Sequence, residues 1–270
     1  MIHDTMSRIF KLFQRKPSHI LNVYCTAGYP HLDSTLPIMR ALQESGVDMI
    51  ELGMPYSDPL ADGPVIQASS EAALDNGMTI DVLFDQLAIL RQPISEGGIG
   101  NELPVILMGY LNPVLQYGIE HFCEKAAAVG VDGIILPDLP PIEFNRQYGG
   151  VFKKYELDFI FLVTPETADE RVRQLDSLSS GFLYAVSSSA TTGKDQNMDR
   201  VNDYLRHLLT LELKNPILVG FGIKDHAGFM RVSEQAAGAI IGSAYIRALQ
   251  GQVHYTEATQ KFIHAILHSS

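Results

Sequence analysis

One carboxylate in the sequence lies where a charge is costly. Glu51 falls inside the apolar segment 49–53, and the neighbouring apolar segments hold no Lys or Arg that could pair with it. Burial favours the protonated carboxyl and raises its pKa toward the range that suits general acid–base catalysis. Glu51 is therefore the first candidate for a catalytic residue, and a structural glutamate paired with a buried base is the alternative.

The segment that follows, residues 55–64, adds two carboxylates, Asp58 and Asp62. Its prolines each fix φ, so we expect a stiff loop that can hold an acid over a pocket. Aspartate also caps turns and helices, and either residue alone could serve only that purpose. Two carboxylates within a dozen residues of Glu51 favour a catalytic site.

Three further segments have the composition of binding loops. Residues 220–223 and 238–244 are rich in glycine, which lets backbone N–H groups bind a phosphate without a cation; tight packing is the alternative. Residues 187–194, small and polar, are typical of a mobile lid and lack the spacing of a P-loop. Neither the nine histidines nor the two cysteines have metal-ligand spacing, so no metal site is predicted.

Eight short apolar segments must position these residues. Each is apolar at most of its positions, as is typical of strands buried on both faces of a parallel sheet. The segments are 19–25, 48–54, 104–110, 133–139, 158–164, 182–187, 216–221 and 237–241. Helical periodicity lies between them, as in residues 80–90 after an expected N-cap at Thr79, and Thr167 with Glu170 matches a capping box.

Eight strands that alternate with helices predict an α/β fold, a (β/α)8 TIM barrel, in which function lies at the C-terminal ends of the strands. An open doubly wound sheet is the alternative, but residues 26–30 lack its glycine fingerprint. Because no linker interrupts the chain, residues 1–270 are expected to form a single domain. The basic, amphipathic residues 1–15 predict an extra N-terminal helix, with an organellar transit peptide as the alternative. The pair Gly149-Gly150 predicts a weakened helix over 144–155.

Composition excludes several classes of function. The 270 residues are 46% hydrophobic and 19% charged, which is an ordinary globular composition. The formal net charge of −11 disfavours binding to nucleic acid by bulk electrostatics. No apolar run approaches the roughly 20 residues that span a bilayer. We therefore expect a soluble, cytoplasmic protein that contacts neither nucleic acid nor membrane.

The segment 51–64, Glu-Leu-Gly-Met-Pro-Tyr-Ser-Asp-Pro-Leu-Ala-Asp-Gly-Pro, closely resembles the signature of the tryptophan synthase alpha subunit family. Further matches follow in order at 110–113, 137–140, 191–193, 220–223 and 242–244, so the resemblance covers nearly the whole chain. It implies a (β/α)8 barrel and a lyase of tryptophan biosynthesis. The implied reaction is the retro-aldol cleavage of indole-3-glycerol phosphate to indole and glyceraldehyde 3-phosphate.

The same resemblance implies roles for individual residues. Glu51 is expected to help protonate indole C3 and to take the proton of the glycerol hydroxyl, while Asp62 accepts a hydrogen bond from the indole N–H and stabilises the cationic intermediate. The other implied residues are Tyr184 beside the acid–base group; Tyr24, Tyr110 and Phe221 around indole; Gly222, Gly242 and Ser243 at the phosphate; Thr192 and Gly193 in the lid; and Asp58 facing the partner.

The resemblance also implies a partner. The expected assembly is an α2β2 heterotetramer with a tryptophan synthase beta subunit, which receives indole through a tunnel. Pyridoxal phosphate belongs to that beta subunit, and no cofactor is expected in this one.

The lid departs from the family pattern. The family usually has Ser-Arg-x-Gly-Val-Thr-Gly, whereas residues 187–193 read Ser-Ser-Ser-Ala-Thr-Thr-Gly, so that Ser188 replaces the arginine and Ala190 the first glycine. These changes are expected to alter lid closure and communication with the beta subunit, and they leave Glu51 and Asp62 unchanged. Two alternative functions remain open: a catalytically weak subunit that mainly activates a beta partner, and a phosphosugar isomerase, which typically needs a His or Lys beside the carboxylate.

Overall fold

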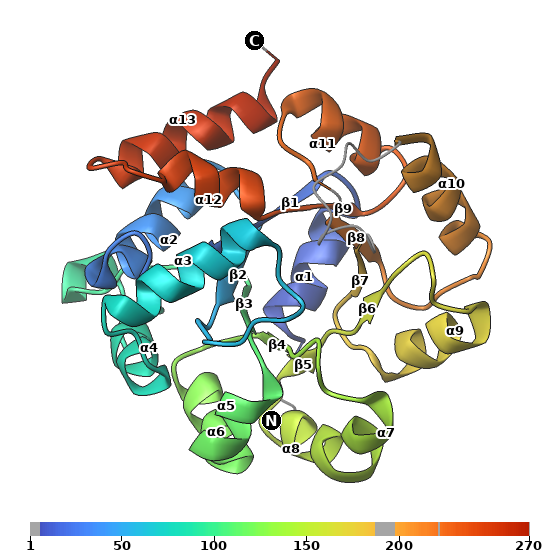
Figure 1. Ribbon diagram of the computed structural model, residues 1–270, viewed down its shortest axis with the longest axis horizontal. Coiled ribbons are helices and arrows are strands. Elements are labelled where there is room, and N and C mark those ends of the chain that lie inside the picture. Colours follow the sequence, from blue (N-terminus) through green and yellow to red (C-terminus); the bar gives the residue numbers. More distant parts are fainter. Residues whose placement is uncertain (1–5, 187–197, 221, 270) are drawn as a thin grey trace.

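The computed structural model describes residues 6–186, 198–220 and 222–269. In this part of the chain the strands all pair in parallel, in the order β5-β4-β3-β2-β1-β9-β8-β7-β6 (Figure 1). They are β1 (Ile20–Thr26), β2 (Met49–Gly53), β3 (Val105–Met108), β4 (Gly133–Ile135), β5 (Asp158–Phe159), β6 (Leu162–Val163), β7 (Leu183–Val186), β8 (Ile217–Gly220) and β9 (Gly238–Ile241).

Strands β5 and β6 are successive pieces of residues 158–163, and this segment closes the sheet into a ring. The Ile160 N–H donates to the Ile134 carbonyl at 3.1 Å, and the Tyr184 N–H donates to the Phe161 carbonyl at 3.0 Å. The ring therefore has eight sides, one from each of the eight apolar segments. The prediction of a (β/α)8 TIM barrel is confirmed.

Most of the helices surround the ring and connect its strands, whereas the N-terminal helix is seen inside the outline of the ring (Figure 1). The helices are α1 (Arg8–Arg15), α2 (Thr35–Glu44), α3 (Pro64–Asp75), α4 (Ile80–Leu87), α5 (Leu111–Tyr117), α6 (Ile119–Ala128), α7 (Pro141–Glu143), α8 (Gly149–Lys154), α9 (Asp169–Leu178), α10 (Met198–Leu209), α11 (His226–Ser233), α12 (Ser243–Leu249) and α13 (Tyr255–Leu267), with short turns η1 (Leu32–Ser34), η2 (Ile94–Glu96) and η3 (Phe144–Tyr148). Among the described helices, none is both long and apolar enough to cross a membrane.

Local sequence explains where some of these helices begin. Thr79 caps α4 as predicted, because its hydroxyl accepts a hydrogen bond from the Val82 N–H at 3.2 Å. The capping box predicted for α9 is wrong. The N-cap of α9 is Ala168, and the Thr167 hydroxyl instead accepts from the Thr164 N–H at 3.0 Å.

The helix expected to be weak over residues 144–155 is irregular rather than absent. Helix α7 runs into the π-helical turn η3 and then into α8. A Cβ added at Gly149 would lie 3.0 Å from the Phe144 ring. The glycine therefore lets Phe144 pack closely, with ring centroids 6.0 Å from Phe152 and 4.5 Å from Phe159.

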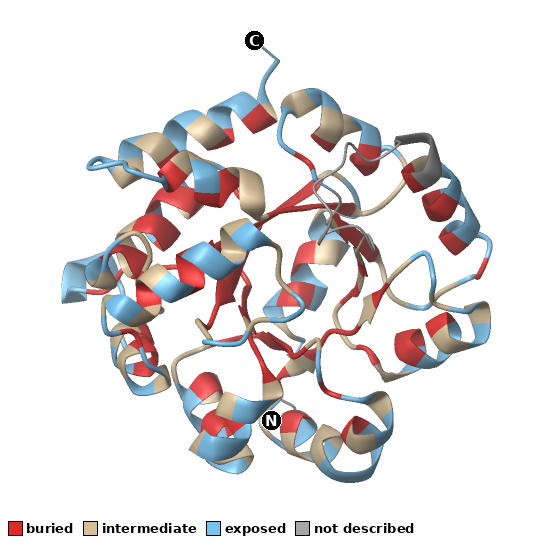
Figure 2. Cartoon of the chain, in the orientation of Figure 1, coloured by how far each residue is buried: buried red, intermediate tan, exposed pale blue. Residues whose placement is uncertain are grey.

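Helix α1 closes the N-terminal end of the barrel and confirms the predicted extra helix. Its buried Ile9 and Leu12 belong to one apolar cluster with the inward-facing residues of the strands. The residues of this cluster in the strands, or directly beside them, are Ile20, Met49, Ile106, Ile135, Ile160, Phe182, Leu218 and Ile240. In Figure 1 the helix is seen through the ring, and Figure 2 shows the strands around it as a largely buried ring.

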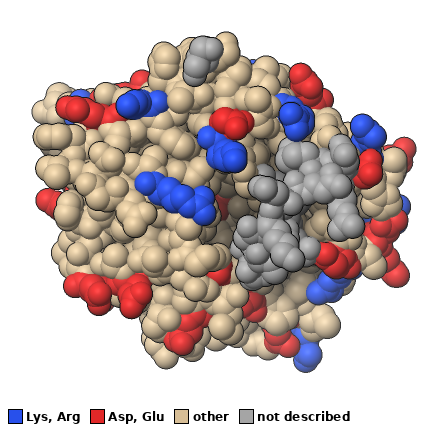
Figure 3. Space-filling view, turned by 45° about the horizontal axis from the view of Figure 1, so that its top comes forward, with Lys and Arg blue, Asp and Glu red and all other residues tan. Residues whose placement is uncertain are grey.

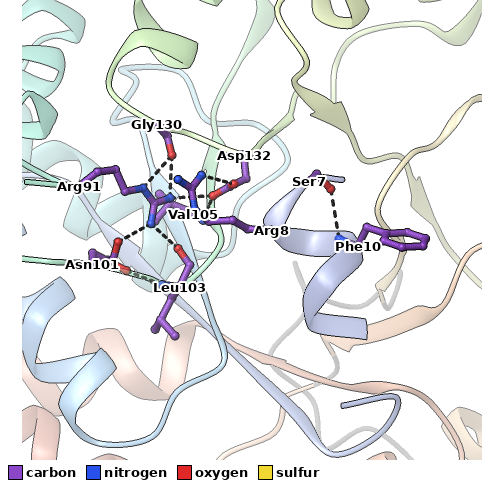
Figure 4. A network of polar contacts seen from close by, with 9 residues as sticks. All are labelled: Ser7, Arg8, Phe10, Arg91, Asn101, Leu103, Val105, Gly130 and Asp132. Atoms are coloured by element: carbon purple, nitrogen blue, oxygen red, sulfur yellow. Dashed lines mark hydrogen bonds and ion pairs between the residues drawn. The ribbon is translucent and has the colours of Figure 1, made fainter. Parts of the chain in front are cut away.

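Asp132 fastens α1, and the loop before β3, to the start of β4 (Figure 4). Its carboxylate accepts hydrogen bonds from Arg8 at 2.9 Å, Arg91 at 2.8 Å and the Val105 N–H at 2.8 Å. Arg91 also donates to the carbonyl oxygens of Asn101, Leu103 and Gly130. This network lies at the N-terminal ends of the strands, so the C-terminal ends remain for the candidate site.

Candidate active site

Glu51 forms the buried centre of the candidate site. Its side chain in β2 is fully buried, and its Oε2 accepts a hydrogen bond from Asn22 Nδ2 in β1 at 3.2 Å. Its Oε1 has no hydrogen-bond partner within the described part of the chain. Among the described residues no Lys or Arg forms an ion pair with Glu51, so the structural alternative, a glutamate paired with a buried base, finds no support there.

Burial raises the pKa of Glu51 to about 8, because removal from water disfavours the charged carboxylate. The hydrogen bond from Asn22 lowers this pKa in part, and the charge of Asp62 raises it. Glu51 is therefore mostly protonated at neutral pH. In that state it can act as a general acid.

Asp62 is held by Tyr110 from the end of the next strand. The Tyr110 hydroxyl donates to Asp62 Oδ2 at 3.0 Å and accepts from the Ala61 N–H at 3.0 Å. Burial raises the pKa of Asp62 to about 6, and the hydrogen bond from Tyr110 opposes that rise. Asp62 is therefore mostly ionised at neutral pH, and the site combines a protonated acid with an anion.

Tyr24 and Tyr184 share the region of the two carboxylates. Burial raises the pKa of both phenols, and the negative charges of Glu51 and Asp62 raise it further. Each ring occupies space left by a glycine at the end of a neighbouring strand. A Cβ added at Gly53 would collide with the Tyr24 hydroxyl, and one at Gly220 would lie 2.6 Å from the Tyr184 ring.

The two glycine segments lie at the ends of β8 and β9, which are neighbours in the ring. Gly242 lies against Tyr24, since a Cβ there would be 3.4 Å from the Tyr24 Cβ. Ser243 follows it as the first residue of α12. Gly222 has a φ of +53°, and no atom of the described residues lies within 4 Å of where its Cβ would be. The backbone at the end of β9 thus lies beside Tyr24, one of the residues around the two carboxylates.

Of the remaining predicted residues, Asp58 is the one that lies within the described part of the chain, and it is apart from this group. Asp58 is exposed, and its carboxylate accepts a hydrogen bond from the neighbouring Ser57 hydroxyl at 2.6 Å. Phe221, Thr192 and Gly193 lie outside the described residues, as do Ser188 and Ala190. Within the described part of the chain, no group of three or more His, Cys, Asp or Glu side chains could hold a metal ion.

The sequence reasoning missed Asn22, which bonds directly to Glu51. A signal was present, because side chains in a strand alternate between faces. Asn22 lies two residues before Tyr24 and therefore shares its inward face. A polar amide in an otherwise apolar inward row marks a residue that needs a partner.

Comparison with known proteins gives a consistent set of relatives. Residues 10–268 match the family model described as tryptophan synthase alpha chain. The tryptophan synthase alpha chain of Flavobacterium johnsoniae is 49% identical over 90% of this chain and 94% of its own length. That of Parabacteroides distasonis is 45% identical over 97% of this chain and 99% of its own.

Solved structures agree with this result. Tryptophan synthase subunit alpha from Legionella pneumophila superposes with a TM-score of 0.87 at 34% identity, and the match covers 97% of this chain and 98% of that one. A chain of the aminoacrylate-bound tryptophan synthase of M. tuberculosis gives a TM-score of 0.81 at 32% identity, with the same coverage of both chains.

Proposed function

The chain belongs to the tryptophan synthase alpha chain family, and we propose that Glu51 and Asp62 perform the acid–base chemistry of its reaction. The protein is a lyase of tryptophan biosynthesis that cleaves indole-3-glycerol phosphate to indole and glyceraldehyde 3-phosphate. One observation carries the assignment of residues. Two carboxylates share a site whose environment keeps one protonated and the other ionised at neutral pH.

Glu51 begins the cycle protonated and gives its proton to C3 of the indole ring. The Glu51 carboxylate then takes the proton of the side-chain hydroxyl next to the bond that breaks. The O–H electron pair becomes the carbonyl of glyceraldehyde 3-phosphate, and the pair of the broken C–C bond returns to the ring. Indole leaves with the proton on C3, and Glu51 is again protonated. The raised pKa of Glu51 supports this order of steps.

Asp62 stabilises the intermediate between these steps. Protonation at C3 leaves a positive charge on the ring nitrogen, and an ionised Asp62 accepts a hydrogen bond from the N–H of that cation. A fixed anion in a site largely withdrawn from water stabilises a developing cation more strongly than water does. The hydrogen bond from Tyr110 supports the role, because it favours the ionised form of Asp62.

The other residues of the site bind the two ends of the substrate. Tyr24, Tyr110 and Phe221 surround the indole ring, and Tyr184 lies beside Glu51. Gly222, Gly242 and Ser243 bind the phosphate through backbone N–H groups and a hydroxyl, which the space that the described residues leave around Gly222 supports. Thr192 and Gly193 belong to a lid over the bound substrate.

A tryptophan synthase beta subunit binds at the C-terminal end of the barrel. Leu60, Leu115 and Ile142 are exposed there, in segments that follow the adjacent strands β2, β3 and β4. Exposed apolar side chains at one end of a molecule are typical of an interface, and Asp58 lies beside Leu60.

The assembly is an α2β2 heterotetramer of the cytoplasm, and residues 1–270 act in it as a single domain. This subunit works without a cofactor of its own, because proton transfer and charge stabilisation suffice for its reaction. Pyridoxal phosphate resides in the beta subunit, to which indole passes.

The test is release of indole from indole-3-glycerol phosphate, with and without a beta subunit, by the parent protein and by Glu51→Gln. We expect slow release that rises with the partner and is lost in the variant, which keeps the shape of Glu51 and cannot transfer its proton. If the folded parent released no indole in either condition while still raising the activity of the beta subunit, the chain would be an activating partner only.

A further inference from the structure

Asn22 is a buried polar side chain that bonds Glu51 directly. It lies in β1 and is fully buried, on the inward row that also contains Ile20 and Tyr24. The apolar cluster closed by α1 includes Ile20 and lies on one side of it. Tyr24 and Glu51, which pair in the register of β1 and β2, lie on the other side. Asn22 therefore separates the apolar floor of the barrel from the reacting groups.

Packing alone does not explain an amide in this place. A buried amide costs free energy unless its hydrogen bonds are made, and an apolar side chain of the same shape carries no such cost. The Nδ2 of Asn22 donates to Glu51 Oε2, while the Oδ1 of Asn22 and the Oε1 of Glu51 find no hydrogen-bond partner among the described residues. Each member of the pair thus keeps one unused oxygen.

The chemistry of an amide matches the two states that Glu51 adopts in the proposed reaction. An ionised carboxylate only accepts hydrogen bonds, whereas a carboxylic acid also donates one. The amide group of Asn22 contains both a donor and an acceptor. Nδ2–H can bond the carboxylate, and Oδ1 can accept the O–H of the acid, because a turn of the amide exchanges the two. Neither a lysine nor an aliphatic residue offers both.

We propose that Asn22 is a positioning residue for the cleavage reaction, whose amide holds the Glu51 carboxyl in place and bonds it in both its protonated and its ionised form. The inference rests on the proposed role of Glu51. Asn22 lies between Glu51 and the apolar floor of the barrel and acts only through its bond to Glu51. It is therefore expected to affect proton transfer and not the affinity for substrate.

The test compares Asn22→Leu, which has nearly the same shape, and Asn22→Val, which favours a strand, with the parent. Indole release is measured over a range of pH, together with kcat and KM. The hydrogen bond to the ionised carboxylate is stronger than the one to the neutral acid, so losing both raises the pKa of Glu51. The limb at high pH is therefore expected to move up by about one pH unit and kcat to fall about 10-fold, with KM unchanged.

Asn101→Leu is the matched control, since Asn101 is also buried but lies in the loop before β3. It is expected to lower stability without moving the pH profile. Folded Asn22 variants whose pH profile and kcat match those of the parent, or whose only change is a higher KM, would overturn the inference. Glu51→Gln in the same assay distinguishes a failure of the proposed function from a failure of the role of Asn22. Full activity of that variant contradicts the proposed function, whereas an inactive Glu51→Gln beside unchanged Asn22 variants contradicts only the role of Asn22.

Discussion

Burial raises the pKa of both carboxylates of the site, but to different extents. Glu51 is completely buried and has a pKa of about 8, whereas Asp62 is partly exposed, is bonded by Tyr110 and has a pKa of about 6. Because the proposed mechanism needs Glu51 protonated and Asp62 ionised, activity is expected only between these two values. The rate of indole release should rise through about pH 6 and fall through about pH 8.

Tyr110→Phe tests the lower of these limbs. The variant loses the hydrogen bond that lowers the pKa of Asp62, so a higher pH is needed to ionise it. The low-pH limb is expected to move upward by about half a pH unit or more. Tyr117→Phe is the control, because the Tyr117 hydroxyl bonds Asp81 outside the barrel. If the low-pH limb of Tyr110→Phe stayed in place, the ionisation of Asp62 would not be the cause of that limb.

The raised pKa of Glu51 also predicts a cost in stability. A carboxyl with a higher pKa in the folded state stabilises the fold while it is protonated, and loses that stabilisation as pH rises from its ordinary value of 4.5 to about 8. Glu51→Gln cannot ionise, so it is expected to be more stable than the parent at pH 8. The difference in free energy of unfolding between Glu51→Gln and the parent should be about 3 kcal/mol larger at pH 8 than at about pH 5.

Urea unfolding of both proteins at the two pH values measures this gain. Glu257→Gln, at an exposed position, is the control, and its difference in stability from the parent should be the same at both pH values. An equal difference between parent and Glu51→Gln at the two pH values would mean that Glu51 ionises as easily in the folded chain as in the unfolded one.

At the scale of elements, the floor of the barrel depends on one buried carboxylate. Asp132→Asn removes the negative charge that pairs with Arg8 and Arg91, and the burial that lowers the pKa of Arg91 to about 10 shows that this cation is costly to leave unpaired. The variant is expected to lose about 3 kcal/mol of stability. Arg8→Met, which removes a half-exposed partner, should lose about 1 kcal/mol or less.

Urea unfolding distinguishes these two losses, and indole release is the second measurement. Both variants should keep the parent's kcat while folded, because the network lies at the end of the barrel opposite Glu51 and Asp62. Equal losses of stability in the two variants would show that the surface pair with Arg8, rather than the bond to Arg91, carries the contribution of Asp132.

Which elements could be predicted depends on whether their cause is local. The eight strands were predictable because burial on both faces makes a segment such as 48–54 apolar at nearly every position. The start of α9 was not, because Thr167 has a competing neighbour, Thr164, that the capping pattern ignores. Asn22 was missed for a related reason. Its partner Glu51 is 29 residues away in the sequence, and only the pairing of β1 with β2 brings the two together.

For the whole molecule, charge and exposed apolar surface point to different partners. Acidic side chains are spread around the edge of the face drawn in Figure 3, with several Lys and Arg side chains nearer its middle. The net charge of −11 gives no general attraction for an anionic substrate, so the proposed phosphate site relies on local groups such as the N–H groups near Gly242. The exposed apolar residues at the same end of the barrel instead suit a protein partner.

The double variant Leu115→Ser, Ile142→Ser tests that surface. Both side chains are exposed, at 41% and 58%, and follow β3 and β4, so the substitutions remove apolar contact area without disturbing the core. Affinity for a beta subunit, measured by titration calorimetry, is expected to fall about 10-fold or more, while indole release by the subunit alone stays at the parent's rate.

Leu209→Ser, Val253→Ser is the matched control, since these side chains are 55% and 79% exposed but lie at the end of α10 and before α13. It removes a comparable amount of apolar surface, and it should leave the affinity for the beta subunit unchanged. If both double variants lowered that affinity equally, general loss of apolar surface would be the cause, and the beta subunit would have to bind elsewhere than beside the ends of β3 and β4.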